Sequence, residues 1–187
     1  AQKKLATVLE DKAKIEGGAS DEDGKVSGFY EWTKPGNIVN ICFGCQNDCI
    51  YCFNKAPAYR RGWVEPGKWS NETIRQDQID ANRGLFSGRV AFPTTHDITL
   101  NNLEGYITVL GKLLRAGNEI LIVSKPRLDC IKRICDTSAF FKGEILFRFT
   151  IGAMDDKILS FWEPNAPSFE ERKQCVEYAK KEGFNTS

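Results

Sequence analysis

The sequence predicts an α/β fold in which parallel βα units form a partial, incomplete TIM-type barrel. Three observations carry this prediction. Short apolar, β-branched segments recur along the chain, a helical pattern follows most of them, and the segment 120–123 lacks the polar alternation of a half-exposed strand. Strands that alternate with helices form right-handed βαβ units and a parallel sheet. Four such units are too few for a closed barrel, and the sequence ends where a fifth strand is due, so we expect the C-terminal strands to be missing.

Each expected element has a local signal. Apolar periodicity predicts strands at residues 38–41, 89–92, 120–123 and 144–150, and helices at residues 70–85, 103–117, 128–140 and 168–181. The second helix follows a capping-box pattern that spans Asn101 and Glu104, and it is closed by Gly117. Ser168 and Glu171 form the same kind of pattern at the start of the fourth helix.

Composition and charge exclude several classes of protein. The 187 residues carry 26 Lys and Arg against 25 Asp and Glu, so a net charge of +1 gives no electrostatic indication of nucleic-acid binding. No apolar run approaches the roughly 20 residues of a membrane span and no signal-peptide pattern is present, which predicts a cytoplasmic protein without membrane contact. Residues 1–35 read as a short amphipathic helix and a solvated linker, and residues 36–187 as the core domain.

Four of the seven cysteines crowd the segment after the first expected strand: Cys42, Cys45, Cys49 and Cys52. Thiolates at this density bind soft metals, either Zn²⁺ or an iron–sulfur cluster. A loop this short wraps awkwardly around one zinc ion, whereas a cubane presents its irons at wider separations. Two interpretations of Cys42 stay open, a buried free thiol or the fourth ligand of a zinc site or electron-transfer cluster.

The other three cysteines, Cys130, Cys135 and Cys175, fall within helical patterns and have no ligand spacing. We expect them in the hydrophobic core, because a free Cys packs as a small apolar residue. The odd number of cysteines and their uneven distribution also argue against a disulfide scaffold.

The spacing Cys45-x-x-x-Cys49-x-x-Cys52, with an aromatic residue before the last Cys, resembles the signature of radical S-adenosylmethionine (SAM) enzymes. The resemblance is nearest to the spore photoproduct lyase and DNA-repair-photolyase-like branch, through the segments 91–98, 124–126 and 150–172, and it covers residues 37–187. It implies a partial TIM-type barrel, a [4Fe–4S] cluster and SAM as cofactors. It also implies reductive cleavage of SAM to a 5′-deoxyadenosyl radical, with an electron donor such as a flavodoxin or a ferredoxin as partner.

The same resemblance implies roles for individual residues. The three cysteines of the motif hold three irons, and the fourth iron is left for SAM. Contacts with SAM are implied for Tyr51, Phe53, Thr94, Thr95, Ser124, Lys125, Arg148 and Thr150. Lys125 is placed to meet the SAM carboxylate, for which an ammonium group supplies a charge and three donors. No catalytic residue is assigned.

The sequence departs from the spore photoproduct lyases at one point. Those enzymes carry a hydrogen-donating cysteine after the second strand, where this chain has residues 93–96, Pro-Thr-Thr-His. A threonine O–H bond is too strong to replace the thiol, which argues against the lyase reaction itself. His96 is either a general acid or base near the substrate or a loop residue whose neighbour Asp97 caps the next helix; we favour the second.

Overall fold

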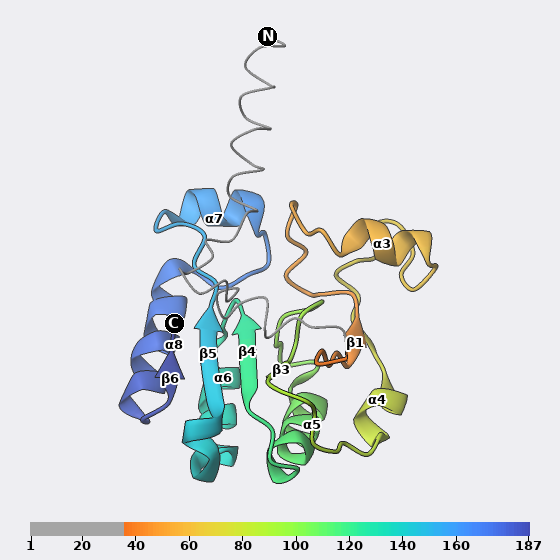
Figure 1. The fold of residues 1–187 in the computed structure, drawn as a ribbon. Coiled ribbons are helices and arrows are strands. Elements are labelled where there is room, and N and C mark those ends of the chain that lie inside the picture. The colour runs from red at the N-terminus through yellow and green to blue at the C-terminus, as the bar shows by residue number, and fades with distance from the viewer. Residues whose placement is uncertain (1–35) are drawn as a thin grey trace, which may run out of the picture.

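The computed structural model describes residues 36–187, so the expected N-terminal helix and linker at residues 1–35 lie outside the described residues. Elements are labelled as in Figure 1. Four parallel strands pair in the order of the chain: β3 (Val90–Ala91), β4 (Ile120–Ser124), β5 (Ile145–Phe149) and β6 (Asn185–Thr186). The prediction of an α/β fold with a parallel sheet is therefore confirmed.

The first expected strand extends this sheet beyond β3. The backbone N–H of Val39 donates to the carbonyl of Ala91 at 3.0 Å, and the N–H of Ala91 donates to the carbonyl of Asn37 at 2.9 Å. The bridge between Ile38 and Ala91 is parallel. Residues 37–39 thus lie beside β3 in the same direction as the other strands, although this pairing is too short to form a strand of its own.

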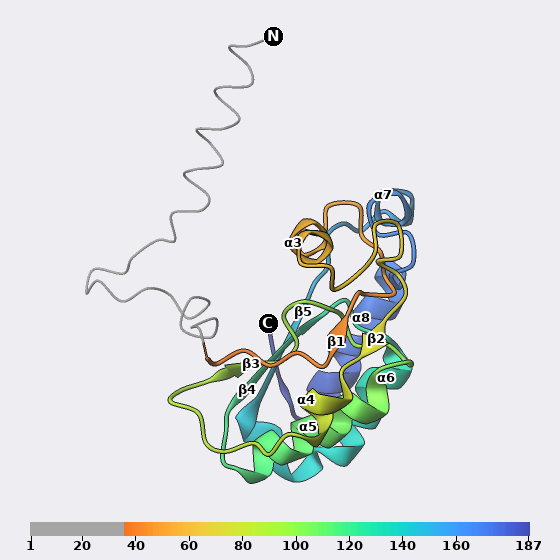
Figure 2. The same ribbon diagram turned by 90° about the vertical axis from the view of Figure 1, so that its right-hand side faces the viewer.

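Three long helices cover one face of the sheet. Figure 2 shows α5 (Leu103–Arg115), α6 (Leu128–Thr137) and α8 (Phe169–Lys181) on the same side of β3, β4 and β5. Alternate strand residues, among them Ile120, Ile122 and Phe147, are fully buried in the core that these helices complete. The core also contains Cys130, Cys135 and Cys175, which confirms that expectation.

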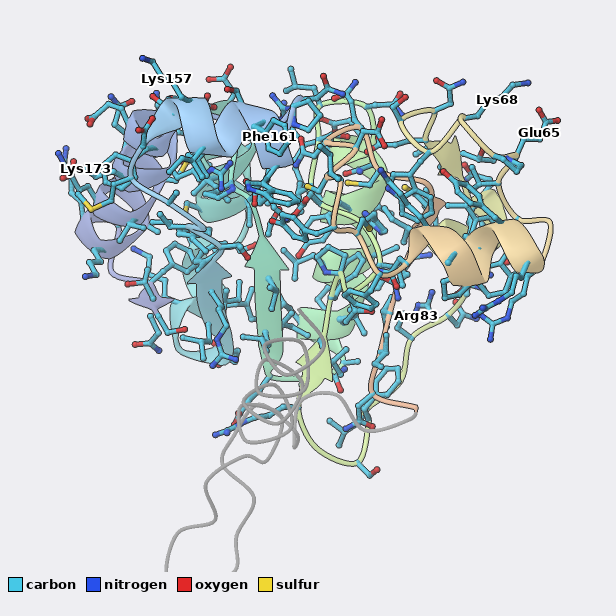
Figure 3. The ribbon with its side chains drawn as sticks, turned by 90° about the horizontal axis from the view of Figure 1, so that it is seen from above. Glu65, Lys68, Arg83, Lys157, Phe161 and Lys173 are labelled. Carbon is cyan, nitrogen blue, oxygen red and sulfur yellow. The ribbon has the colours of Figure 1, made fainter. Side chains whose placement is uncertain are left out.

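Smaller elements lie around the carboxyl ends of the strands. β1 (Cys42–Phe43) pairs antiparallel with β2 (Thr73–Ile74), and two short helices, α3 (Lys55–Arg60) and α7 (Asp156–Trp162), follow the cysteines and β5 respectively. Seen from above, α7, with Phe161, and α3 lie on opposite sides of the molecule (Figure 3). The region between them is where the cysteine segment runs.

The helix expected at residues 70–85 is wrong in most of its length. Only α4 (Gln76–Asp80) is helical, because Thr73 and Ile74 pair with β1 instead. The helix does not continue past Asp80. The ammonium group of Lys112 donates to the carbonyls of Ile79, Asp80 and Ala81, at 2.6, 3.1 and 3.3 Å. Long-range partners therefore overrode a local helical pattern.

Other boundaries also differ from expectation. The third helix ends at Thr137, and a 3₁₀ helix, η1 (Ala139–Glu144), takes the place of its last turn. The capping box at Asn101 does not form, since Asn102 is the N-cap residue of α5 and has no capping hydrogen bond from its side chain. Ser168 does cap α8, accepting from the N–H of Glu171 at 3.2 Å.

Within residues 36–187, no helix combines the length and the apolar character needed to cross a membrane.

Candidate metal and cofactor site

The cysteine loop, residues 42–54, begins with a tight bend at Gly44. This glycine has φ of +81°, and a Cβ atom there would lie 2.7 Å from the carbonyl oxygen of Trp69 and 2.8 Å from that of Asn71. No side chain is tolerated at such distances. The bend allows the N–H of Cys45 to donate to Trp69 at 2.8 Å, which fixes the first cysteine of the motif.

Two further turns set the spacing of the motif cysteines. The N–H of Asp48 donates to the carbonyl of Cys45 at 3.1 Å, and the N–H of Cys52 donates to the carbonyl of Cys49 at 3.2 Å. Asp48 adopts a positive φ of 48° and forms an ion pair with Lys55 at 2.7 Å. The intervals of three and two residues between cysteines are therefore folded into consecutive turns.

The far side of the loop is held by the segment around α7. The N–H of Ile50 donates to the carbonyl of Trp162 at 2.9 Å, and the side chain of Asn165 donates to the carbonyl of Gln46 at 3.1 Å. Arg127, at the start of α6, donates to the side-chain oxygen of Asn47 at 2.9 Å. The loop is thus attached on this side to two parts of the chain that are distant in sequence, residues 162–165 and the start of α6.

Asp97 connects the cysteine loop to β4. Its carboxylate accepts from the side chain of Asn47 at 3.0 Å, from the hydroxyl of Ser124 at 3.1 Å and from the N–H of Lys125 at 2.8 Å. The ammonium group of Lys125 lies 3.6 Å from the same carboxylate. One buried acid therefore fixes two residues implied in SAM binding beside the loop that carries the motif.

Lys125 is also the positive charge of this site. Its ammonium nitrogen lies 5.7 Å from the ring centre of Tyr51, within cation–π range. Burial by itself lowers the pKa of Lys125, but the acidic groups around it, the Asp97 carboxylate foremost, raise that pKa above the usual lysine value. Lys125 is therefore a cation held between Asp97 and the Tyr51 ring beside the cysteine loop.

The motif thiols lie beside charged and hydrogen-bonding groups, with Cys45 and Cys49 buried and Cys52 half-buried. Burial raises the pKa of Cys45 and of Cys49, Asp97 raises that of Cys45 further, and Lys125 opposes the rise at Cys49. The N–H of Asp97 donates to the sulfur of Cys45 at 3.4 Å. Backbone donors of this kind stabilise a thiolate that coordinates iron and tune the cluster. Among the described residues the three thiols do not form a group arranged to hold a metal ion, but thiols beside an ammonium group and an N–H donor are the ligand chemistry that an iron–sulfur cluster takes.

Cys42 has a different environment from the motif cysteines. It is 1% exposed, and its thiol donates to the carbonyl of Gly44 at 3.6 Å, within the loop. Burial, and after it the negative charge of Glu72, raises its pKa. Burial raises the pKa of Cys45 in the same way, so what distinguishes Cys42 is its place at the start of the loop and its bond within the loop. Among the described residues, no group of three or more His, Cys, Asp and Glu side chains is arranged to hold a metal ion.

A second buried group supports the site from behind. Glu163 and Arg172 are 2% and 0% exposed, and they form an ion pair at 2.6 Å. The hydroxyl of Tyr51 donates to the other oxygen of Glu163. Arg172 also donates to the carbonyls of Pro167 and Thr150, at 2.9 and 3.2 Å. This chain of contacts ties the tyrosine of the motif to α8.

The remaining residues implied in SAM binding are distributed unevenly. Thr94 and Thr95 are fixed by Asn40, whose side-chain oxygen accepts from both backbone N–H groups at 2.8 and 2.9 Å. The two threonines thus lie at the end of β3, next to the loop. Phe53 is 79% exposed, and Arg148 donates to the hydroxyl of Ser187 at 3.2 Å. These last two are not brought to the group around Asp97.

The interpretation of Asp97 as a helix cap is wrong. The N-cap of α5 is Asn102, and the carboxylate of Asp97 is used by the groups around the cysteine loop. His96 is 6% exposed, and its Nε2 accepts from the N–H of Ile41 at 3.3 Å. Its Nδ1 lies 3.0 Å from the carbonyl oxygen of Asp97, so the neutral ring is fixed between two backbone groups and has a structural role.

Four residues of this site have a role that the sequence pattern did not predict: Asp97, Asn47, Glu163 and Arg172. Asn47 lies between two motif cysteines, and its place in the motif is the one local signal that could have identified it. The other three act through partners that are distant in the sequence: 9 residues separate Glu163 from Arg172, 52 separate Asp97 from Cys45, and 112 separate Glu163 from Tyr51. No local pattern reports such distances.

Comparisons with known proteins are sparse. No family model matches the chain, and no solved structure matches it. The chain is similar to the uncharacterized protein ORF301 of Acidianus two-tailed virus, with 26% identity over 163 residues, which are 80% of this chain and 53% of that protein. The chain therefore spans about half the length of this relative.

Proposed function

We propose that residues 36–187 are a radical SAM domain that binds a [4Fe–4S] cluster through Cys45, Cys49 and Cys52. When bound and reduced, the cluster and SAM together supply a 5′-deoxyadenosyl radical. A flavodoxin or a ferredoxin is the proposed electron donor, and the reducing cytoplasm the proposed location, because an iron–sulfur cluster with an open site is sensitive to oxygen.

The observation that carries this proposal is the meeting of the cysteine loop with the end of β4. Lys125 is 74 positions after Tyr51 of the motif, yet its ammonium group lies 5.7 Å from the centre of that ring and 3.6 Å from Asp97. Asp97 in turn receives the N–H of Lys125 and gives its own N–H to Cys45. A fixed cation beside the loop that carries the three cysteines is what a carboxylate ligand on the open iron requires.

The winding of the sheet also supports the proposal. The strands pair in chain order, and α5, α6 and α8 cover a single face (Figure 2). A barrel wall is wound in this way, whereas a doubly wound sheet has helices on both faces. We propose that this sheet is part of a TIM-type barrel, with the cysteine loop at the carboxyl end of its first strand, where βα proteins place their chemistry.

In this proposal the chain's own residues have three tasks. The turns of the loop hold the three thiols apart, and the N–H of Asp97 stabilises the thiolate of Cys45. Lys125 and Ser124 receive a carboxylate, with Asp97 as the positioning residue for both. Tyr51, held by Glu163, forms a flat wall beside Lys125 for the nucleoside part of the ligand.

The test is SAM cleavage by the protein reconstituted anaerobically with iron and sulfide and reduced with dithionite. We expect 5′-deoxyadenosine by mass spectrometry and none from Cys52→Ala. Cys42→Ala is the matched control, since it removes a cysteine of the same loop that donates within the loop. We expect this variant to keep the four-iron absorbance and the product.

Two outcomes would contradict the proposal. Loss of the cluster in Cys42→Ala would show a four-cysteine site, as in an electron-transfer or zinc module. Tightly bound zinc after reconstitution, without iron, would exclude the cluster.

A further inference from the structure

A cavity of about 440 Å³ lies between the cysteine loop and α3. Its wall includes Phe43 and Gly44 at the start of the loop, Asn54 two residues after the last motif cysteine, and Thr95 after β3. The cavity thus borders the cysteine loop, yet neither the motif cysteines nor the group around Asp97 line it.

The charge of the cavity has one sign. Its only charged lining residues, among those the structure describes, are Arg61 and Arg75. Arg75 also pairs with Asp77 at 3.4 Å, and Asp77 is not part of the wall. Within residues 36–187, no carboxylate lies within ion-pair distance of Arg61. A cavity with two guanidinium groups and no acid attracts anions.

The arginines belong to a stack of aromatic rings. The rings of Phe43 and Trp63 lie 5.0 Å apart with an angle of 22° between their planes. Arg61 lies 4.8 Å from the centre of Trp63, and Arg75 lies 4.7 Å from the centre of Phe43. A guanidinium that lies over a ring keeps its N–H groups free at its edge for a carboxylate or a phosphate.

One buried donor of the wall has no partner. Trp69 is 3% exposed, and among the described residues its indole N–H has no hydrogen-bond acceptor. A buried indole N–H is usually bonded, and leaving it without an acceptor costs free energy. Trp69 lines the cavity, so an acceptor atom on a bound ligand is a natural partner.

From these three features we infer that the cavity binds a small planar anion, in which a carboxylate or a phosphate is attached to a flat ring. The rings of Phe43, Trp63 and Trp69 provide the apolar wall, and Arg61 and Arg75 receive the anionic group. That this ligand is the substrate of the cluster site rests on the proposed function. The binding itself does not.

The test uses the full chain without a cluster, in which Trp63 and Trp69 report binding through their fluorescence. Benzoate and phenyl phosphate are the two anionic probes, benzamide is the neutral probe of the same shape, and inorganic phosphate is the anion without a ring. We expect saturable quenching by one or both ring anions, and the stronger of the two identifies a carboxylate or a phosphate as the preferred group. Benzamide and inorganic phosphate should bind at least about tenfold more weakly.

Arg61→Gln and Arg75→Gln should each raise the Kd of the preferred probe by about tenfold, the effect of one charge-assisted contact. Arg60→Gln is the matched control: an exposed arginine next to Arg61 that does not line the cavity. Equal binding of benzamide, no saturable change with either ring anion, or an equal loss in Arg60→Gln would each overturn the inference. Because no cluster is present, such a result leaves SAM cleavage untouched, and absence of SAM cleavage leaves anion binding untouched.

Discussion

Replacing Arg172 by Met should be among the most damaging single substitutions in this chain. Its guanidinium is 0% exposed and bonds to Glu163, Pro167 and Thr150. Breaking a buried ion pair from one side costs about 3–5 kcal/mol, because the remaining charge is left uncompensated. The two carbonyls that lose their donor add to this cost. We expect a loss of at least about 4 kcal/mol, a large part of the ~5–15 kcal/mol that stabilises a typical domain.

Urea unfolding of the metal-free protein, followed by circular dichroism, measures this loss. With a slope of about 2 kcal/mol per molar urea, the midpoint should fall by roughly 2 M. Arg133→Met is the matched control, since Arg133 forms a 2.8 Å ion pair with Glu104 in which the two side chains are 53% and 74% exposed. It should cost less than about 1 kcal/mol.

The double variant Arg172→Met with Glu163→Gln removes the stranded charge and should recover at least about 2 kcal/mol relative to Arg172→Met alone. Two results would refute this reasoning: a loss for Arg172→Met no larger than that for Arg133→Met, or a double variant no more stable than the single one.

Three further outcomes are expected. Lys125→Met should raise the Kd for SAM by about tenfold and leave the cluster absorbance unchanged. Lys132 is an exposed lysine of α6, and Lys132→Met should change neither quantity. Equal effects of the two substitutions would contradict the role of Lys125. Burial lowers the pKa of His96, so the folded state favours the neutral ring. As the pH drops below ~6.5, the unfolded chain takes up a proton at His96 before the folded protein does. The free energy of unfolding should therefore fall, by up to about 1.4 kcal/mol per pH unit. Urea midpoints between pH 7 and 5 measure this, and His96→Gln should remove the slope; a slope kept in that variant assigns it to other groups. In the metal-free protein iodoacetamide should label Cys52 first, because the other six cysteines are buried; peptide mass spectrometry showing Cys42 labelled as fast would disprove that order.

Local patterns predicted much of the fold correctly. The apolar run at 120–124 and the stripe of α5 are strong because every residue contributes to the same periodicity, and the cap at Ser168 depends on four consecutive residues. The helix expected at 70–85 failed for the opposite reason. Thr73 and Ile74 found partners in β1, some 30 residues earlier in the chain, and the chain after Asp80 bonds to Lys112.

The sequence by itself determined the spacing of Cys45, Cys49 and Cys52, the glycine that the bend of their loop requires, and the alternation of strands and helices. All three depend on residues that are neighbours in the chain. Only the tertiary structure decided which groups meet the cysteines. Asp97 and Lys125 reach the loop because β3 and β4 are adjacent and parallel, so their carboxyl ends lie side by side. Glu163 and Arg172 are buried together because α7 and α8 enclose them, and a charge is stable there only with its partner.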